Sequence, residues 1–163
     1  MRTRDLADPT SWRYWDGDGF EGVWGDPYRE ELTPQDKCAP LADDQLSGSL
    51  NESVIFDERI ERFVSVGISF DPAGAPGFAV YYATSADLVE WTTRQLLLEV
   101  PVNNTVADPD NDTVHAYPAL IDPDSPSPNF ETSDGQMYHY LSRFNFGGNS
   151  LDRDLLRWPV EFT

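Results

Sequence analysis

The stretch Tyr81-Tyr82-Ala83-Thr84-Ser85-Ala86-Asp87-Leu88-Val89-Glu90-Trp91 decides the fold expected of this chain. Its apolar beginning predicts the end of a strand, and Asp87-Leu88 predicts a turn into a further strand. The Asp-Leu…Trp element also occurs at Asp5-Leu6…Trp12 and at Asp154-Leu155…Trp158, so its Asp residues lie 82 and 67 positions apart. Such recurrence is typical of repeat architectures. We therefore expect repeated units, and we expect the chain to open inside one, because its first element is the one that closes the others.

A second correspondence joins the first strands of the two full units. Ser53-Val54-Ile55-Phe56-Asp57 predicts a short strand ending at an acid, and Pro118-Ala119-Leu120-Ile121-Asp122 follows 65 positions later. Alternating apolar residues predict the remaining strands. In the first unit these are 63–68, 78–83 and a fourth strand led by Trp91 through Leu98; in the second they are 137–141 and 155–162, after an insertion at 123–135 that lengthens the first hairpin.

These strands predict an all-β chain. Four short antiparallel strands in each repeated unit are typical of a β-propeller blade, so we expect a partial propeller of about two full blades and the end of a preceding one. The expected divisions are 1–25 (the end of a blade, as a strand, a turn at residues 16–20 and an edge strand), 26–50 (a connection), 51–100 (a blade) and 101–163 (the last blade). A β-sandwich is the structural rival, although it would not produce three matching Asp-Leu…Trp elements.

The composition excludes several classes of function. The 163 residues carry 29 acids against 11 bases, a net charge of −18, which repels phosphate backbones and argues against nucleic-acid binding. No run of 18 apolar residues predicts a membrane helix, and the N-terminus has no apolar segment typical of a signal peptide. The acidic surface fits a secreted or extracellular parent protein. The single cysteine, Cys38, allows no internal disulfide.

The stretch at 81–91 resembles a signature of the five-bladed propeller glycoside hydrolases, the arabinanases, β-xylosidases and fructosidases of the family 43 and family 32 type. In that family the third strand of a blade ends in Ser-x-Asp-Leu-x-x-Trp and leads into the outer strand. The resemblance implies that the chain corresponds to the C-terminal blades of a five-bladed domain. It also implies that the Trp91 ring packs between blades. It says nothing about the substrate, because propellers host many functions.

The resemblance also implies a catalytic residue. An inverting glycosidase needs a carboxylic acid and a carboxylate base about 6.5–9.5 Å apart across the scissile bond. The position that matches the family's acid is Glu52, before Ser53-Val54, where the family has Gly-Pro. The plainer interpretation of Glu52 is an exposed acid before a strand. The family's base has no match here, and we expect it upstream of residue 1.

The start of the last unit supplies two candidate substrate-binding residues. His115 matches the family histidine near the central channel, where it binds water or a metal ion, and Tyr117 could line the sugar cleft. A satisfied buried histidine and a packed strand-end tyrosine are the structural alternatives. Apart from a calcium ion or water near His115, we expect no cofactor and no metal site.

We therefore expect part of a carbohydrate-active protein resembling an inverting glycoside hydrolase, in which Glu52 protonates the leaving oxygen. We expect this chain alone to be inactive, because its catalytic base would be absent. The alternatives are a non-catalytic propeller that binds sugar or protein, favoured by the missing Gly-Pro after Glu52, and a fragment with no activity of its own.

Overall fold

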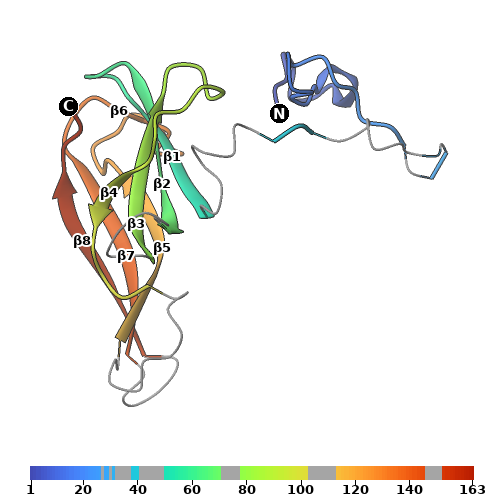
Figure 1. The fold of residues 1–163 in the computed structure, drawn as a ribbon. Helices are drawn as coiled ribbons and strands as arrows, with labels where there is room; N and C mark the ends of the chain where they lie inside the picture. The colour runs from blue at the N-terminus through green and yellow to red at the C-terminus, as the bar shows by residue number, and fades with distance from the viewer. Residues whose placement is uncertain are drawn as a thin grey trace. The chain divides into compact units, whose positions relative to one another are not determined.

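A computed structural model of the chain describes residues 1–26, 28–29, 31, 38–40, 50–70, 78–102, 113–145 and 152–163. For residues 50–52 and 70 it describes the backbone only. The chain divides into two compact units, residues 1–43 and 44–163. The second unit is drawn in Figure 1 with its strands labelled from β1 to β8. The only helix among the described residues is a three-residue 3-10 turn, so none of them forms a helix long and apolar enough to cross a membrane.

The N-terminal unit contains no strand among its described residues, so the expected strand and edge strand over 1–25 are wrong. It has a 3-10 turn, η1 (Pro9–Ser11), and two isolated bridges, Arg2 with Arg13 and Tyr14 with Gly22. Polar side chains in this unit hydrogen-bond to the backbone. Asp8 Oδ1 accepts from the Thr10 amide at 2.8 Å and caps η1. Tyr14 is buried, and its ring lies where a side chain at position 22 would stand.

The turn expected at residues 16–20 is confirmed. Asp16 Oδ1 accepts from the amides of Asp18 and Gly19 at 3.0 and 2.9 Å, and Gly17 adopts φ +111°. Only glycine enters that backbone region without strain, which explains the Asp-Gly pairing in the sequence.

The first sheet is a meander of four antiparallel strands extended by a short parallel strand from the second half of the unit. Its order is β4-β3-β2-β1-β6. The strands are β1 (Leu50–Asp57), β2 (Arg62–Phe70), β3 (Phe78–Ser85), β4 (Gln95–Leu98) and β6 (Thr132–Ser133). The expected fourth strand is therefore shorter than predicted: Trp91 makes only an isolated bridge to Ser85, and pairing resumes at Gln95.

Among the described residues, the second sheet has three strands in the order β5-β7-β8, whereas four were expected. They are β5 (Thr113–Ile121), β7 (Met137–Asn145) and β8 (Arg153–Val160). The insertion at 123–135 does lengthen the first hairpin, as predicted, but it also delivers β6 to the other sheet. There Phe56 pairs with Thr132, and Asp57 pairs with Ser133.

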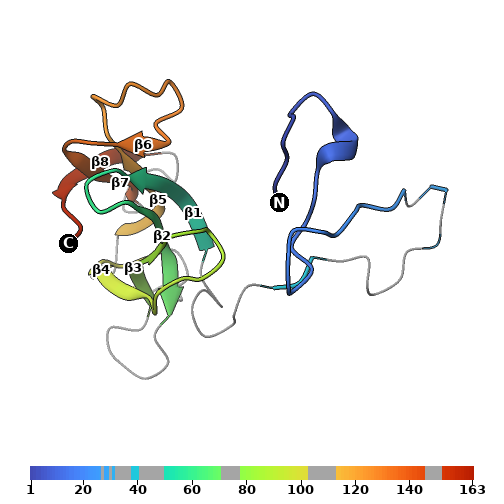
Figure 2. The ribbon, with the colours of Figure 1, turned by 90° about the horizontal axis from the view of Figure 1, so that it is seen from above.

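The two sheets pack face to face over shared apolar side chains. They approach each other along β1, β2 and β5, and Figure 2 shows them spreading apart toward β4 and β8. Two groups of buried side chains, each drawn from both sheets, fill the space between them. The first is Ile55, Val64, Val66, Leu120, Met137 and Phe162, and the second is Ile68, Val80, Val102, Ala116, Leu141 and Phe144.

The Asp-Leu…Trp elements do not share one structure. At Asp87 the prediction of a turn is confirmed: Oδ1 accepts from the amides of Val89 and Glu90 at 2.8 and 2.9 Å, and Leu88 adopts φ +67°. The third element is different, because Asp154 and Trp158 both lie inside β8. Asp154 Oδ2 instead accepts from the Arg143 side chain at 2.6 Å. The Asp154 carboxylate therefore binds Arg143 on the neighbouring strand and does not cap a turn.

Candidate functional site

The strands β1 and β5 each carry an irregularity at the same relative position. In β1, Asn51 pairs with Gly67 and Ser53 pairs with Val66, so Glu52 is an extra residue in the ladder. In β5, Tyr117 and Pro118 are the residues at which the register against β7 shifts. Tyr117 lies 65 positions after Glu52, the spacing that also relates the two strands in the sequence. Bulges of this kind often re-aim side chains next to active sites.

The two bulged strands are joined across the interface between the sheets. Ser53 Oγ accepts a hydrogen bond from the Leu120 amide at 3.1 Å. Ser53 follows Glu52 directly, so this bond holds the β1 bulge beside the middle of β5. Ser53 therefore has a structural role.

Glu52 lies within β1, so its backbone belongs to a strand and not to the exposed loop of the plainer interpretation. Its side chain lies outside the described residues. From their matching places in the two units we expect Glu52 and His115 on the same face, and this stays a prediction because the structure describes only one of the two side chains. The residue equivalent to Glu52 by register is Tyr117, two positions after His115.

His115 is buried and held by the backbone of the segment before β5. Its Nδ1 lies 3.0 Å from the Pro101 carbonyl oxygen, and its amide donates to the same oxygen at 2.8 Å. Because a carbonyl can only accept, Nδ1 carries the proton of this bond and Nε2 is the nitrogen left for any other partner. The side chain is 8% exposed, so little of it is accessible from solution.

Tyr117 is the accessible member of the set. It is 59% exposed, and its ring centroid lies 6.0 Å from that of Phe144. Its φ of +58° is unusual for a bulky residue and costs about 1–2 kcal/mol relative to an extended backbone. The bulge thus leaves a largely exposed aromatic residue in the middle of β5. Flat aromatic rings of this kind suit the apolar faces of sugars and other planar or ring-shaped ligands.

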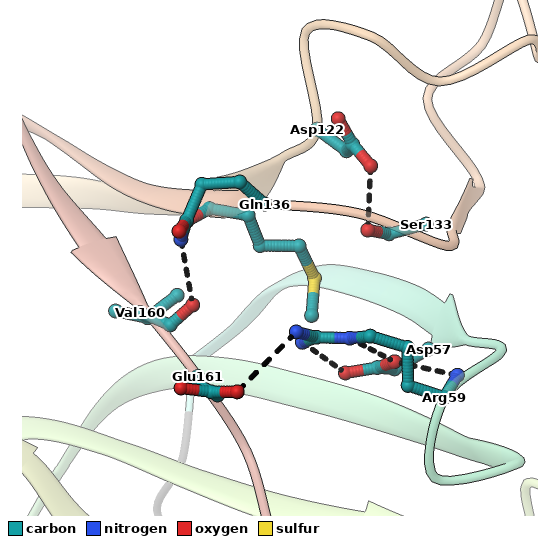
Figure 3. A network of polar contacts seen from close by, with 8 residues as sticks. Asp57, Arg59, Asp122, Ser133, Gln136, Val160 and Glu161 are labelled. Atoms are coloured by element: carbon teal, nitrogen blue, oxygen red, sulfur yellow. Dashed lines mark hydrogen bonds and ion pairs between the residues drawn. The ribbon is translucent and has the colours of Figure 1, made fainter.

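A buried polar network lies at the opposite ends of the same strands, and sequence reasoning did not predict it (Figure 3). Asp57 has no exposed surface; its Oδ1 accepts from the Arg59 amide and its Oδ2 lies 3.0 Å from Arg59 Nη2. Hydrogen bonding to Asp57 raises the pKa of Arg59. Arg59 also reaches Glu161 at 3.7 Å. This fork neutralises a carboxylate that would otherwise be buried alone.

Asp122 occupies the corresponding end of β5 and has no exposed surface either. Its Oδ1 accepts from the Asp124 amide at 2.9 Å, and its Oδ2 accepts from the Ser133 hydroxyl at 2.6 Å. Ser133 belongs to β6, which pairs with β1 at Asp57. The network therefore ties both strand ends together. The signal for it was present in the 65-residue repeat, where each first strand ends at an aspartate.

The carboxylates of Asp57 and Asp122 are both engaged in hydrogen bonds, and this limits their chemistry. Each accepts hydrogen bonds on both carboxylate oxygens, so neither is free to move a proton to a ligand. Within the described ranges, no three His, Cys, Asp or Glu residues are grouped to hold a metal ion. We therefore consider the two bulges, with Glu52 and Tyr117, the candidate functional site. The network around Asp57 and Asp122 has a structural role, because it connects the two sheets.

Comparisons of this chain with protein-family models, with curated proteins and with solved structures find no match.

Proposed function

We propose that residues 50–163 form two adjacent blades of a β-propeller in a carbohydrate-active protein resembling an inverting glycoside hydrolase. The observation that carries this proposal is the pair of bulges at Glu52 and Tyr117, 65 positions apart on neighbouring first strands. Blades of one propeller repeat the same irregularity at the same depth, and bulges at that point direct side chains toward a ligand.

The order of the strands supports blades over a sandwich. Apart from the two-residue β6, each sheet is built from strands that follow one another in the chain, whereas most sandwiches use Greek-key connections that pass between sheets. The sheets also lie closest along their first strands and spread apart beyond them (Figure 2). First strands gathered near one axis, with later strands fanning outward, are the arrangement of a propeller.

In this proposal each residue near the two bulges has a separate role. Glu52 protonates the leaving oxygen of the scissile glycosidic bond, and the exposed Tyr117 ring stacks on a sugar. His115, whose Nδ1 is engaged by Pro101, contributes only through Nε2, as a hydrogen-bond partner of water or substrate. The carboxylate base that activates water on the other face of the sugar comes from outside these residues, since inversion requires two carboxyl groups.

The test separates binding from turnover. Binding of arabino-, xylo- and fructo-oligosaccharides to the chain is measured by calorimetry for the wild type, Tyr117→Ala and Glu52→Gln. We expect no hydrolysis by any of them, and at least tenfold weaker binding by Tyr117→Ala. Turnover by the wild type that Glu52→Gln abolishes would place the base within this chain and contradict the assignment of the blades. Failure of every oligosaccharide to bind would overturn the proposal.

A non-catalytic binding propeller is the second candidate, and one observation favours it. Ser53 stands where the resemblance has glycine, and its hydroxyl accepts from the Leu120 amide, a bond that glycine could not make. The pH dependence of ligand affinity distinguishes the two candidates. If Glu52 is the catalytic acid, ligand affinity changes with pH, and Glu52→Gln would remove that change. In a binding module the affinity depends on Tyr117 and not on Glu52.

A further inference from the structure

The second sheet leaves one long edge open. Of the other sheet edges, that of β1 pairs with β6 at Phe56 and Asp57 and bonds to β5 through Ser53, that of β5 is bridged at His115 by Val102, and β4 has only four residues. The strand β8 runs for eight residues, and in the described part of the chain it pairs only with β7 (Figure 1). A long open edge is a ready template for another strand.

The register shows which backbone groups face outward. Residues of an antiparallel pair alternate between those that exchange hydrogen bonds and those that do not. Pro159 stands opposite Tyr138 and has no amide hydrogen, whereas the Asn145 amide donates to Asp152 at 3.0 Å one pair beyond the ladder. Both facts place the outward-facing amides and carbonyls at Arg153, Leu155 and Arg157.

The first sheet shows how such an edge is filled. The strand β8 follows β7 as β3 follows β2, and β3 carries β4 on its outer side, with Val80 pairing Leu98 and Tyr82 pairing Gln95. Among the described residues, no strand pairs with β8 on the equivalent side. In the described part of the chain, the second sheet is therefore one antiparallel strand short of the first.

The side chains of β8 indicate the charge of the strand that fits. The Arg153 guanidinium lies 4.3 Å from the Phe144 ring centroid, and that of Arg157 lies 4.7 Å from the Tyr138 ring centroid. Neither makes an ion pair with a described residue. Between them Leu155 is 71% exposed. In a chain of net charge −18, this edge presents two pre-positioned cations around an apolar residue.

We propose that β8 binds an extended acidic segment of a partner protein, which adds to the sheet as an antiparallel fourth strand. Its acids would lie opposite Arg153 and Arg157 and an apolar residue opposite Leu155, because directly opposed cross-strand pairs stabilise a sheet when their charges are opposite. A second copy of this chain suits the edge poorly: antiparallel pairing about Leu155 would set Arg153 against Arg157 twice. This inference does not depend on the proposed carbohydrate function.

The test uses the whole chain and two blocked nonapeptides, TTETVTETT and its lysine counterpart TTKTVTKTT. Amide hydrogen exchange and NMR shifts of β8 are the readout. In the free chain the amides of Arg153, Leu155 and Arg157 should exchange fast and those of Leu156 and Trp158 slowly. The glutamate peptide should slow the first three, and the lysine peptide should bind at least tenfold more weakly.

Reversing the charges of Arg153 and Arg157 then tests whether these residues cause the preference for the glutamate peptide. The double variant Arg153→Glu/Arg157→Glu should lose the glutamate peptide and gain the lysine peptide. The control Arg4→Glu/Arg29→Glu changes the net charge equally in the N-terminal unit and should behave as the wild type. No protection of the three amides by either peptide would overturn the proposal. So would concentration-dependent protection without peptide, since the edge would then bind a second copy of the chain.

Discussion

The two first strands, β1 and β5, end alike and are completed differently. The last residue of β1 is Asp57, Asp122 directly follows β5, and neither aspartate has exposed surface. Asp57 is satisfied by Arg59, two residues away, through a tight turn. The Asp122 carboxylate accepts from the hydroxyl of Ser133, which lies 11 residues further along the chain. The same burial problem is solved once by a local charge and once by a hydroxyl that comes from the other sheet.

The largest effect should come from the core residues that the repeat makes equivalent, Ile55 and Leu120. Both are buried in the same apolar group. Either Ile55→Ala or Leu120→Ala should lower the free energy of unfolding by about 2–5 kcal/mol, because each leaves a cavity that both sheets share. Urea unfolding measures it. If the changes in the double variant sum independently, the two sheets do not share one core.

The next effect concerns a position at which the sheets differ. His139 stands opposite Leu120 as Val64 stands opposite Ile55, and both are buried. Burial lowers the pKa of His139 from 6.5 to about 4. Between these values the unfolded chain binds a proton that the folded chain does not, so stability should fall by about 3 kcal/mol as the pH drops from 6.5 to 4.

The matched variant is His139→Val, because valine stands at the equivalent position of the first sheet, Val64. Its free energy of unfolding should lose this part of the pH dependence, while the contribution of the carboxylates remains in both proteins. Unfolding in urea at a series of pH values from 7 to 4 gives the difference. Parallel pH profiles for the two proteins would mean that His139 is solvated in the folded state.

A smaller contrast should separate the two aspartates. Asp57→Asn removes a charge-assisted fork to Arg59 and should cost about 2 kcal/mol, because hydrogen bonds to charged groups contribute about 1.5–3 kcal/mol. Asp122→Asn keeps an acceptor, and the Ser133 hydroxyl can rotate to suit the amide, so its cost should be about 1 kcal/mol. Thermal unfolding of the two variants tests the ranking. Equal or reversed costs would show that the Ser133 bond matters at least as much as the Arg59 fork.

The smallest contrast concerns the repeated Asp-Leu…Trp element. Asp87→Ala removes the acceptor of two turn amides and should cost about 1 kcal/mol. Asp154→Ala removes an exposed partner of Arg143, whose effect should be smaller still and should vanish at high salt. Melting temperatures at low and high salt distinguish the two. A salt-sensitive Asp87 variant would mean that its turn depends on charge and not on hydrogen bonds.

Much of the fold was readable from local pattern. The strands at 53–57, 63–68, 78–83 and 137–141 were predicted close to their observed positions, because alternation of apolar residues is set by neighbours in the chain. The turns at Asp16 and Asp87 were predicted for the same reason, since an aspartate caps amides two and three residues on. The candidate site was less readable: Tyr117 and Glu52 were singled out, but their equivalence through the two bulges was not.

The sequence by itself therefore determined the all-β class, most strand positions and the 65-residue correspondence that ends in Asp57 and Asp122. Tertiary structure alone decided that Asp154 lies in a strand, that β6 crosses to the first sheet and that Asp122 binds Ser133. It also decided that, in the described part of the chain, no strand pairs with the outer edge of β8. The physical reason is range: turns and alternation depend on residues a few positions apart, whereas each of these outcomes depends on which distant strand supplies the arginine, hydroxyl or backbone partner.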